Sequence, residues 1–126
     1  MGPLSTHIAY ATAQGPIFAS YYYSGSDVPQ FQGGGNATVA IAQCDPGEVV
    51  VGGGGDAGTT HTRMREGKTY PDFVTVGGSR PTNDGTGWVV WGVYQLPIAE
   101  EDVGGDSTND RTPGAVTAWA VCAKVG

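Results

Sequence analysis

Charged residues are scarce in this chain, making up 14% of its 126 residues, whereas about 25% is typical of soluble domains. Positive charge is the scarcest kind, because all six lysines and arginines lie at or beyond Arg63 and the net charge is −6. Nucleic-acid binding and docking on an anionic membrane both need a basic surface. The sequence therefore argues against either partner.

Two kinds of apolar pattern are also missing. No stretch approaches the ~20 apolar residues of a membrane-spanning helix, and no long window has the 3.6-residue apolar repeat of an amphipathic helix. Residues 1–6 lack the basic and apolar segments of a secretory signal. We therefore expect either a mature fragment of a longer chain or a protein released from the cell by lysis.

Glycine, in contrast, is abundant, with 22 copies. It costs a helix about 1 kcal/mol per position relative to alanine, while it suits turns, bulges and close strand contacts. Short apolar runs alternate with turn signals such as Asp45-Pro46-Gly47 and residues 80–87. The clearest run, residues 88–96, is apolar on both faces and should be covered on both sides. The sequence predicts an all-β fold, an antiparallel β-sandwich that is jelly-roll-like or Ig-like.

The chain divides into two expected parts. Residues 1–36 are rich in proline and aromatic residues and contain short β-prone pieces at 8–11 and 17–23. They predict an extended N-terminal arm that serves oligomerisation, with edge strands as the alternative. Residues 37–126 predict the β-sandwich domain. Glycines 52–55 indicate a bulge or a close backbone crossing. Residues 56–68 and the acidic stretch at 97–114 are expected to be loops.

Cys44 and Cys122 are the only cysteines. A disulfide between them would stabilise the fold by roughly 4–5 kcal/mol in the chain-entropy model; two buried thiols in a reducing compartment are the alternative. A zinc site is not expected, because there is no Cys-x-x-Cys and there are only two histidines. The sequence predicts no metal and no cofactor.

Catalytic groups are equally sparse. His7 and His61 are the only histidine bases available, and neither lies in a recognisable motif, so we expect surface histidines and no enzyme. A pocket that joins His61 to a carboxylate and a hydroxyl would change that view. In the acidic stretch, the alternative to a solvated loop is a calcium site, with hard oxygen ligands from Asp102, Asp106, Asn109 and Asp110.

Surface contacts are the remaining source of function. Tyr21, Tyr22 and Tyr23 could pack on a partner or stack on sugars, and so could any exposed tryptophan among Trp88, Trp91 and Trp119; core packing is the alternative for the tryptophans. A basic cluster could meet the acidic stretch of an adjacent copy. The predicted interface residues are Tyr21, Tyr22, Tyr23, Phe31, Arg63 and Arg65.

Several short motifs follow one another in a characteristic order: Cys44-Asp45-Pro46-Gly47, residues 49–54, Ser79-Arg80-Pro81, Gly87-Trp88 and residues 118–123. They resemble the "Cys-Pro-x-Gly…Gly-Gly-Gly…Pro…Gly-Trp…Ala-x-Cys" β-domains of secreted bacterial proteins and bacteriophage fibre and decoration proteins, except that Asp45 separates the cysteine from the proline. The resemblance implies a virion or extracellular β-sandwich, a disulfide between the two cysteines, and no catalytic residues to transfer.

The expected function is therefore that of a non-enzymatic structural protein of a virus particle. A bacteriophage capsid decoration protein or fibre protein fits best, with contacts to its own copies, for example in a trimer, and to other virion proteins. The alternative is a secreted carbohydrate-binding or adhesion module that contacts surface glycans.

Overall fold

The computed structural model describes residues 5–19, 21–22, 25–31, 37–95 and 111–125. Within these ranges the chain forms β-strands and no helix, and so no helix that could cross a membrane. The long strands are β1 (Thr6–Phe18), β4 (Val39–Gln43), β5 (Glu48–Gly58), β8 (Phe73–Pro81), β9 (Gly87–Gln95) and β10 (Arg111–Lys124). The short strands are β2 (Tyr21–Tyr22), β3 (Gln30–Phe31), β6 (Thr62–Arg65) and β7 (Lys68–Pro71).

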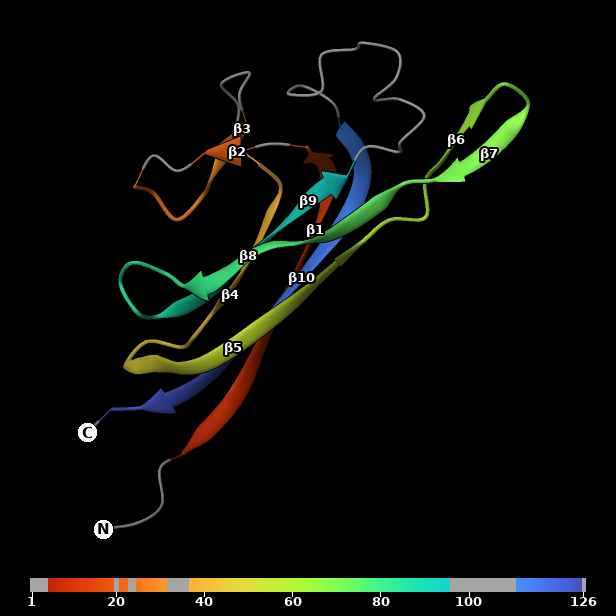
Figure 1. The fold of residues 1–126 in the computed structure, drawn as a ribbon. Helices are drawn as coiled ribbons and strands as arrows, with labels where there is room; N and C mark the ends of the chain where they lie inside the picture. Colours follow the sequence, from red (N-terminus) through yellow and green to blue (C-terminus); the bar gives the residue numbers. More distant parts are fainter. Residues whose placement is uncertain (1–4, 20, 23–24, 32–36, 96–110, 126) are drawn as a thin grey trace.

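Two antiparallel sheets of three strands pack face to face (Figure 1). One has the order β1-β10-β5 and is called the β10 sheet; the other has the order β4-β9-β8 and is called the β9 sheet. The central strands β10 and β9 lie against each other, while β1 packs on β4 and β5 on β8. The predicted all-β sandwich is confirmed.

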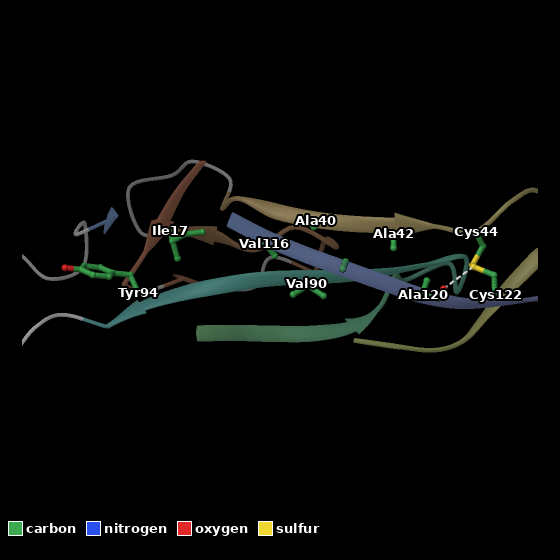
Figure 2. Close-up of a cluster of buried hydrophobic side chains, with 10 residues drawn as sticks. Ile17, Ala40, Ala42, Cys44, Val90, Tyr94, Val116, Ala120 and Cys122 are labelled. Carbon is green, nitrogen blue, oxygen red and sulfur yellow. Dashed lines mark hydrogen bonds between the residues drawn. A yellow bond between two sulfur atoms is a disulfide. The ribbon is translucent and has the colours of Figure 1, made fainter. Parts of the chain in front are cut away.

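The core lies between the two sheets and follows the two-residue alternation of the strands. From β10 it takes Val116, Ala118, Ala120 and Cys122, and from β9 it takes Val90 and Tyr94 (Figure 2). Side chains on the other face of β9 are also buried, since Val89 and Trp91 have 0% exposure. The prediction that this strand is covered on both sides is therefore confirmed.

The glycine run in β5 lets the sheets approach closely. A Cβ atom on Gly53 would lie 2.3 Å from Trp88 Cδ2, and one on Gly55 would lie 2.4 Å from Val90 Cγ2. The register with β10 also shifts here, because Val121 pairs with Gly52 while Cys122 pairs with Val50. The bulge expected for glycines 52–55 is present at the start of the run, and the close approach to the facing sheet is to side chains and not a crossing of two backbones.

A disulfide ties the two sheets together. Cys44 follows β4 in the β9 sheet, Cys122 belongs to β10, and their Cα atoms are 5.6 Å apart. Both side chains are buried (Figure 2). The covalent link suggested by the two lone cysteines is present, and it joins positions separated by 78 residues.

The N-terminal part of the chain differs from the expected arm. Residues 6–18 form β1, which pairs along its whole length with β10, and Ile17 at its end is buried in the core. This strand belongs to the sandwich instead of extending away from it, because its inward alanines fit against the core. Contacts of residues 1–36 with neighbouring subunits remain a prediction.

The region 56–68, expected to be a loop, is largely strand. β5 continues to Gly58, and β6 and β7 form a hairpin whose turn places Glu66 and Gly67 at φ values of 52° and 76°. The hairpin projects from the end of the molecule opposite to the start of β1 and the end of β10 (Figure 1). Its strands lack an apolar face, which is why alternation could not reveal them. The calcium candidates Asp102, Asp106, Asn109 and Asp110 lie outside the described residues.

Candidate functional site

The outer face of the β10 sheet carries the candidate site. Its residues alternate with those that face the core, and the strand register arranges them in four cross-strand rows. From the disulfide end outward, the rows are Ile8–Val121–Gly52, Tyr10–Trp119–Gly54, Thr12–Thr117–Asp56 and Gln14–Ala115–Gly58. Each row runs from β1 across β10 to β5. The face is thus apolar and aromatic at one end and polar at the other.

An aromatic pair marks the middle of this face. Tyr10 is 69% exposed and lies directly across from Trp119, which is half-buried. The indole of Trp119 extends over β5, because a Cβ atom on Gly54 would lie 2.6 Å from its Cζ2 atom. Gly54 therefore gives the indole room to lie along the sheet. The result is a low, flat aromatic surface.

An open groove of about 540 Å³ adjoins the aromatic pair at the polar end. The sheet contributes Gln14, Asp56 and Thr117 to its lining, and the segment after β5 contributes Thr59, Thr60 and His61. One carboxylate oxygen of Asp56 accepts the backbone N–H of Ala57 at 2.9 Å. The groove therefore presents amide, carboxylate, hydroxyl and imidazole groups beside an aromatic surface.

A buried carboxylate holds His61 in place at the groove. Its Nδ1 lies 2.7 Å from Oδ2 of Asp72, whose side chain has 0% exposure, while the imidazole is 42% exposed. The Thr112 hydroxyl donates to the same Oδ2 atom at 2.5 Å. Two hydrogen bonds from backbone N–H groups also hold His61: His61 N donates to the Thr59 hydroxyl, and Asp72 N donates to the His61 carbonyl. Because Nδ1 is engaged, Nε2 is the imidazole atom available to a ligand.

The groove joins His61 to a carboxylate and a hydroxyl, and such a pocket would favour an enzyme. In a nucleophilic triad, however, the hydroxyl bonds to the histidine nitrogen that is not held by the carboxylate. Here the hydroxyl of Thr112 bonds to the carboxylate itself, and that of Thr59 donates to the Pro113 carbonyl. Among the described residues, no hydroxyl is hydrogen-bonded to Nε2 of His61. The chemistry of this geometry is hydrogen bonding by a fixed imidazole.

Among the predicted interface residues, Tyr21 is the one whose side chain the structure describes, and it does not lie on this face. The hydroxyl of Tyr21 donates to the Gly77 carbonyl at 2.9 Å, and its ring meets Trp91 edge-on at 5.6 Å, so Tyr21 packs on the β9 sheet of its own domain. Tyr23 lies outside the described residues. Tyr22, Phe31, Arg63 and Arg65 lie in short strands, and their side chains are likewise outside what the structure describes.

Sequence reasoning missed Tyr10, Asp72 and the groove residues other than His61. Tyr10 was assigned to the arm, and Asp72 follows Pro71 in a segment read only as a strand. A lone acid inside an apolar strand run is a signal for a buried, partnered carboxylate, and it could have led to Asp72. Trp119 was considered among the tryptophans that might be exposed, and it is the one on the outer face.

Comparison of the chain with protein-family models, with curated proteins and with solved structures found no match.

Proposed function

We propose that this protein is a non-enzymatic contact protein whose outer β10-sheet face binds a carbohydrate chain. The observation that carries the proposal is the row of Tyr10 and Trp119 beside the polar groove. Sugar rings have apolar C–H faces that pack on aromatic rings, and their hydroxyls need hydrogen-bond partners close by. The outer face offers both within a few residues of each strand.

The dimensions of the face suit an extended ligand. Tyr10 and Gln14 are four residues apart on one strand, which corresponds to about 13 Å at ~3.3 Å per residue. A short oligosaccharide can therefore rest one ring on Tyr10 and Trp119 while another reaches the groove. Asp56 is the only charged side chain in the four rows, so the face favours a neutral or cationic saccharide over a strongly anionic one.

The virion remains the setting that we propose, as a bacteriophage fibre or capsid decoration protein; a secreted adhesion module is the alternative. The disulfide supports a location outside the reducing cytoplasm. A fibre or decoration protein with a saccharide-binding face would attach the particle to surface glycans of a cell. The proposal that the protein is not an enzyme is supported by the hydroxyls of Thr112 and Thr59 near His61, which donate to Asp72 and to the Pro113 carbonyl.

A second candidate function, contact between copies of this chain, is favoured by the aliphatic residues at the disulfide end. Ile8 is 50% exposed, Val51 60% and Val49 40%. Val49 and Val51 alternate with Val50, which packs on the core, so both face outward with Ile8. These aliphatic side chains offer a saccharide neither hydrogen bonds nor an aromatic ring, whereas a subunit interface of about 800 Å² per partner would bury them.

Glycan-array screening of the intact protein, followed by calorimetric titration of the best ligand, tests the first proposal. Tyr10→Ala and Trp119→Ala should each weaken binding by about 5–30-fold, which corresponds to about 1–2 kcal/mol of lost packing. Phe73→Ala is the matched control, because Phe73 is an aromatic residue with 56% exposure on the other sheet. Equal losses in all three variants, or no glycan binding by the wild type, would contradict the proposal.

Native mass spectrometry over a range of concentrations tests the second candidate. Val51→Lys should shift an oligomer towards monomers, because it places a charge in the aliphatic patch, and it should leave glycan binding unchanged. A wild-type protein that stays monomeric at high concentration would remove self-association and leave the carbohydrate proposal standing.

A further inference from the structure

The disulfide end of the sandwich gathers four potential metal ligands. One ring nitrogen of His7, one carboxylate oxygen of Glu48 and Sγ of Cys122 all lie within 4.8 Å of one another. His7 Nε2 and Glu48 Oε1 are 2.7 Å apart. Sγ of Cys44 is bonded to that of Cys122 and therefore belongs to the same group. Imidazole nitrogen, carboxylate oxygen and thiolate sulfur are the three ligand types that zinc prefers.

Rigid elements hold these four residues. His7 and Cys122 are direct cross-strand partners on β1 and β10. Glu48 begins β5 after a tight turn in which Glu48 N donates to the Asp45 carbonyl, and the Glu48 carboxylate accepts the backbone N–H of Asp45 at 2.8 Å. Its side chain is only 10% exposed. The backbone N–H of Cys44 donates to the Thr86 carbonyl, which fixes the fourth position.

The distances suit a tetrahedral ion after small side-chain rotations. Zinc–ligand bonds of about 2.0–2.3 Å place neighbouring ligand atoms about 3.4–3.8 Å apart. His7 Nε2 and Glu48 Oε1 are now 2.7 Å apart and would have to separate by about 0.7 Å to reach the lower end of this spacing. The two cysteine Cα atoms are 5.6 Å apart, which lets the sulfurs sit side by side on one ion without backbone movement.

We propose that the reduced form of this protein binds one Zn²⁺ through Cys44, Cys122, His7 and Glu48 at the position that the disulfide occupies in the oxidised form. Two equivalents of a small-molecule thiol supply the two electrons that break the S–S bond; they join as one disulfide, and their two protons complete the two cysteine thiols. Zinc then replaces the two thiol protons, which are released to solvent. This site could not be predicted from the sequence, because its ligands are far apart along the chain and form no local motif.

Zinc in the reduced protein and the disulfide in the oxidised protein would each cross-link the two sheets. Both join β10 to the end of β4, and zinc would also recruit β1 and β5 through His7 and Glu48. With the thiols deep in the sandwich, at 6% and 0% exposure for Cys44 and Cys122, the ion would bind as the reduced chain folds. The two sheets would then be cross-linked by zinc before the protein reaches an oxidising environment, and by the disulfide afterwards.

The test starts from protein that has been reduced in denaturant with a phosphine and then refolded with or without one equivalent of Zn²⁺. We expect one bound Zn²⁺ per reduced chain by native mass spectrometry, none on the oxidised protein, and a higher melting temperature with the metal. Substitution by Co²⁺ should give the thiolate-to-cobalt charge-transfer absorption of a tetrahedral site. Failure to bind stoichiometric zinc, or failure of the reduced chain to fold with and without zinc, would overturn the proposal.

Matched variants separate this site from non-specific binding by a pair of thiols. His7→Gln and Glu48→Gln should each lower the zinc affinity, measured by chelator competition, by at least about tenfold. His61→Gln and Glu66→Gln make the same chemical changes elsewhere and should leave the affinity unchanged. Equal affinities for wild type, His7→Gln and Glu48→Gln would show that the cysteines alone hold the ion, and the four-ligand site would be rejected.

Discussion

Replacing Gly55 by alanine tests the claim that glycine in β5 sets the distance between the sheets. The added methyl carbon would lie 2.4 and 2.5 Å from the two γ carbons of Val90 and 2.7 Å from the Thr117 carbonyl oxygen. Carbon atoms prefer separations of about 3.5–4.0 Å. Val90 is fully buried, and the carbonyl belongs to the neighbouring strand, so neither contact can be relieved by a surface side chain moving aside.

The expected cost follows from these contacts. Overpacking a core typically costs about 1–3 kcal/mol, while alanine recovers about 0.4–1 kcal/mol by restricting the unfolded chain. We expect the net effect of Gly55→Ala to be a fall of about 0.5–2.5 kcal/mol in the free energy of unfolding. For a domain of this size, that corresponds to a fall in melting temperature of roughly 2–12 °C. Urea denaturation and calorimetry of the oxidised protein measure both quantities.

Gly52→Ala on the same strand is the matched control. A Cβ atom there meets nothing within 4 Å, and Gly52 is not among the glycines with positive φ. It should be neutral or stabilise the protein by up to about 1 kcal/mol. Val90→Ala removes the two atoms that clash with alanine at position 55, so the double variant should be at least about 1 kcal/mol more stable than the sum of the single effects. Equal melting temperatures for Gly55→Ala and Gly52→Ala would refute the reasoning.

Three further predictions concern stability. Replacing Cys44 and Cys122 together by alanine should lower the free energy of unfolding by about 4.5 kcal/mol for a link across 78 residues; a loss below ~1 kcal/mol in urea titration would contradict the chain-entropy account. Asp72→Ala leaves two hydrogen-bond donors without their buried acceptor and should cost about 1–3 kcal/mol, measured in the same assay. Hydrogen bonds from the Thr82 and Thr86 side chains lower the pKa of Asp84 from its ordinary value of 3.8. A lowered pKa gives stability that is complete above 3.8 and lost as the pH falls through the folded-state pKa. The difference in melting temperature between wild type and Asp84→Asn should therefore be present at pH 7 and shrink in strong acid; a difference that does not change with pH would contradict this.

The strands of the core were predictable because their hydrophobic alternation is strong. Along β10, inward Val116, Ala118, Ala120 and Cys122 alternate with outward residues, and β9 is apolar on both faces. β1 could be predicted only as an edge-strand alternative to the arm, because its inward residues are Ala9, Ala11 and Ala13. Their small side chains bury little area individually and give a weak hydrophobic signal. The same small size lets β1 pack closely on β4.

The candidate face could be predicted less well, because it depends on strand register. Tyr10 and Trp119 become neighbours only through the pairing of β1 with β10, which joins the two ends of the chain. Gly54 gains its role only once the indole lies over it. The partnership of His61 with Asp72 likewise depends on how the chain returns from the β6–β7 hairpin. The residue types therefore indicated which side chains could bind a ligand. Strand pairing determines which of those side chains lie next to one another.

The start of β1 and the end of β10 are direct partners, with Thr6 opposite Ala123, so the backbone enters and leaves the sandwich about 5 Å apart. Gln14 lies eight residues farther along β1, which places the groove about 27 Å away from that point. The sandwich can therefore be grafted by both ends into a surface loop of a carrier protein, with its groove held clear of the carrier.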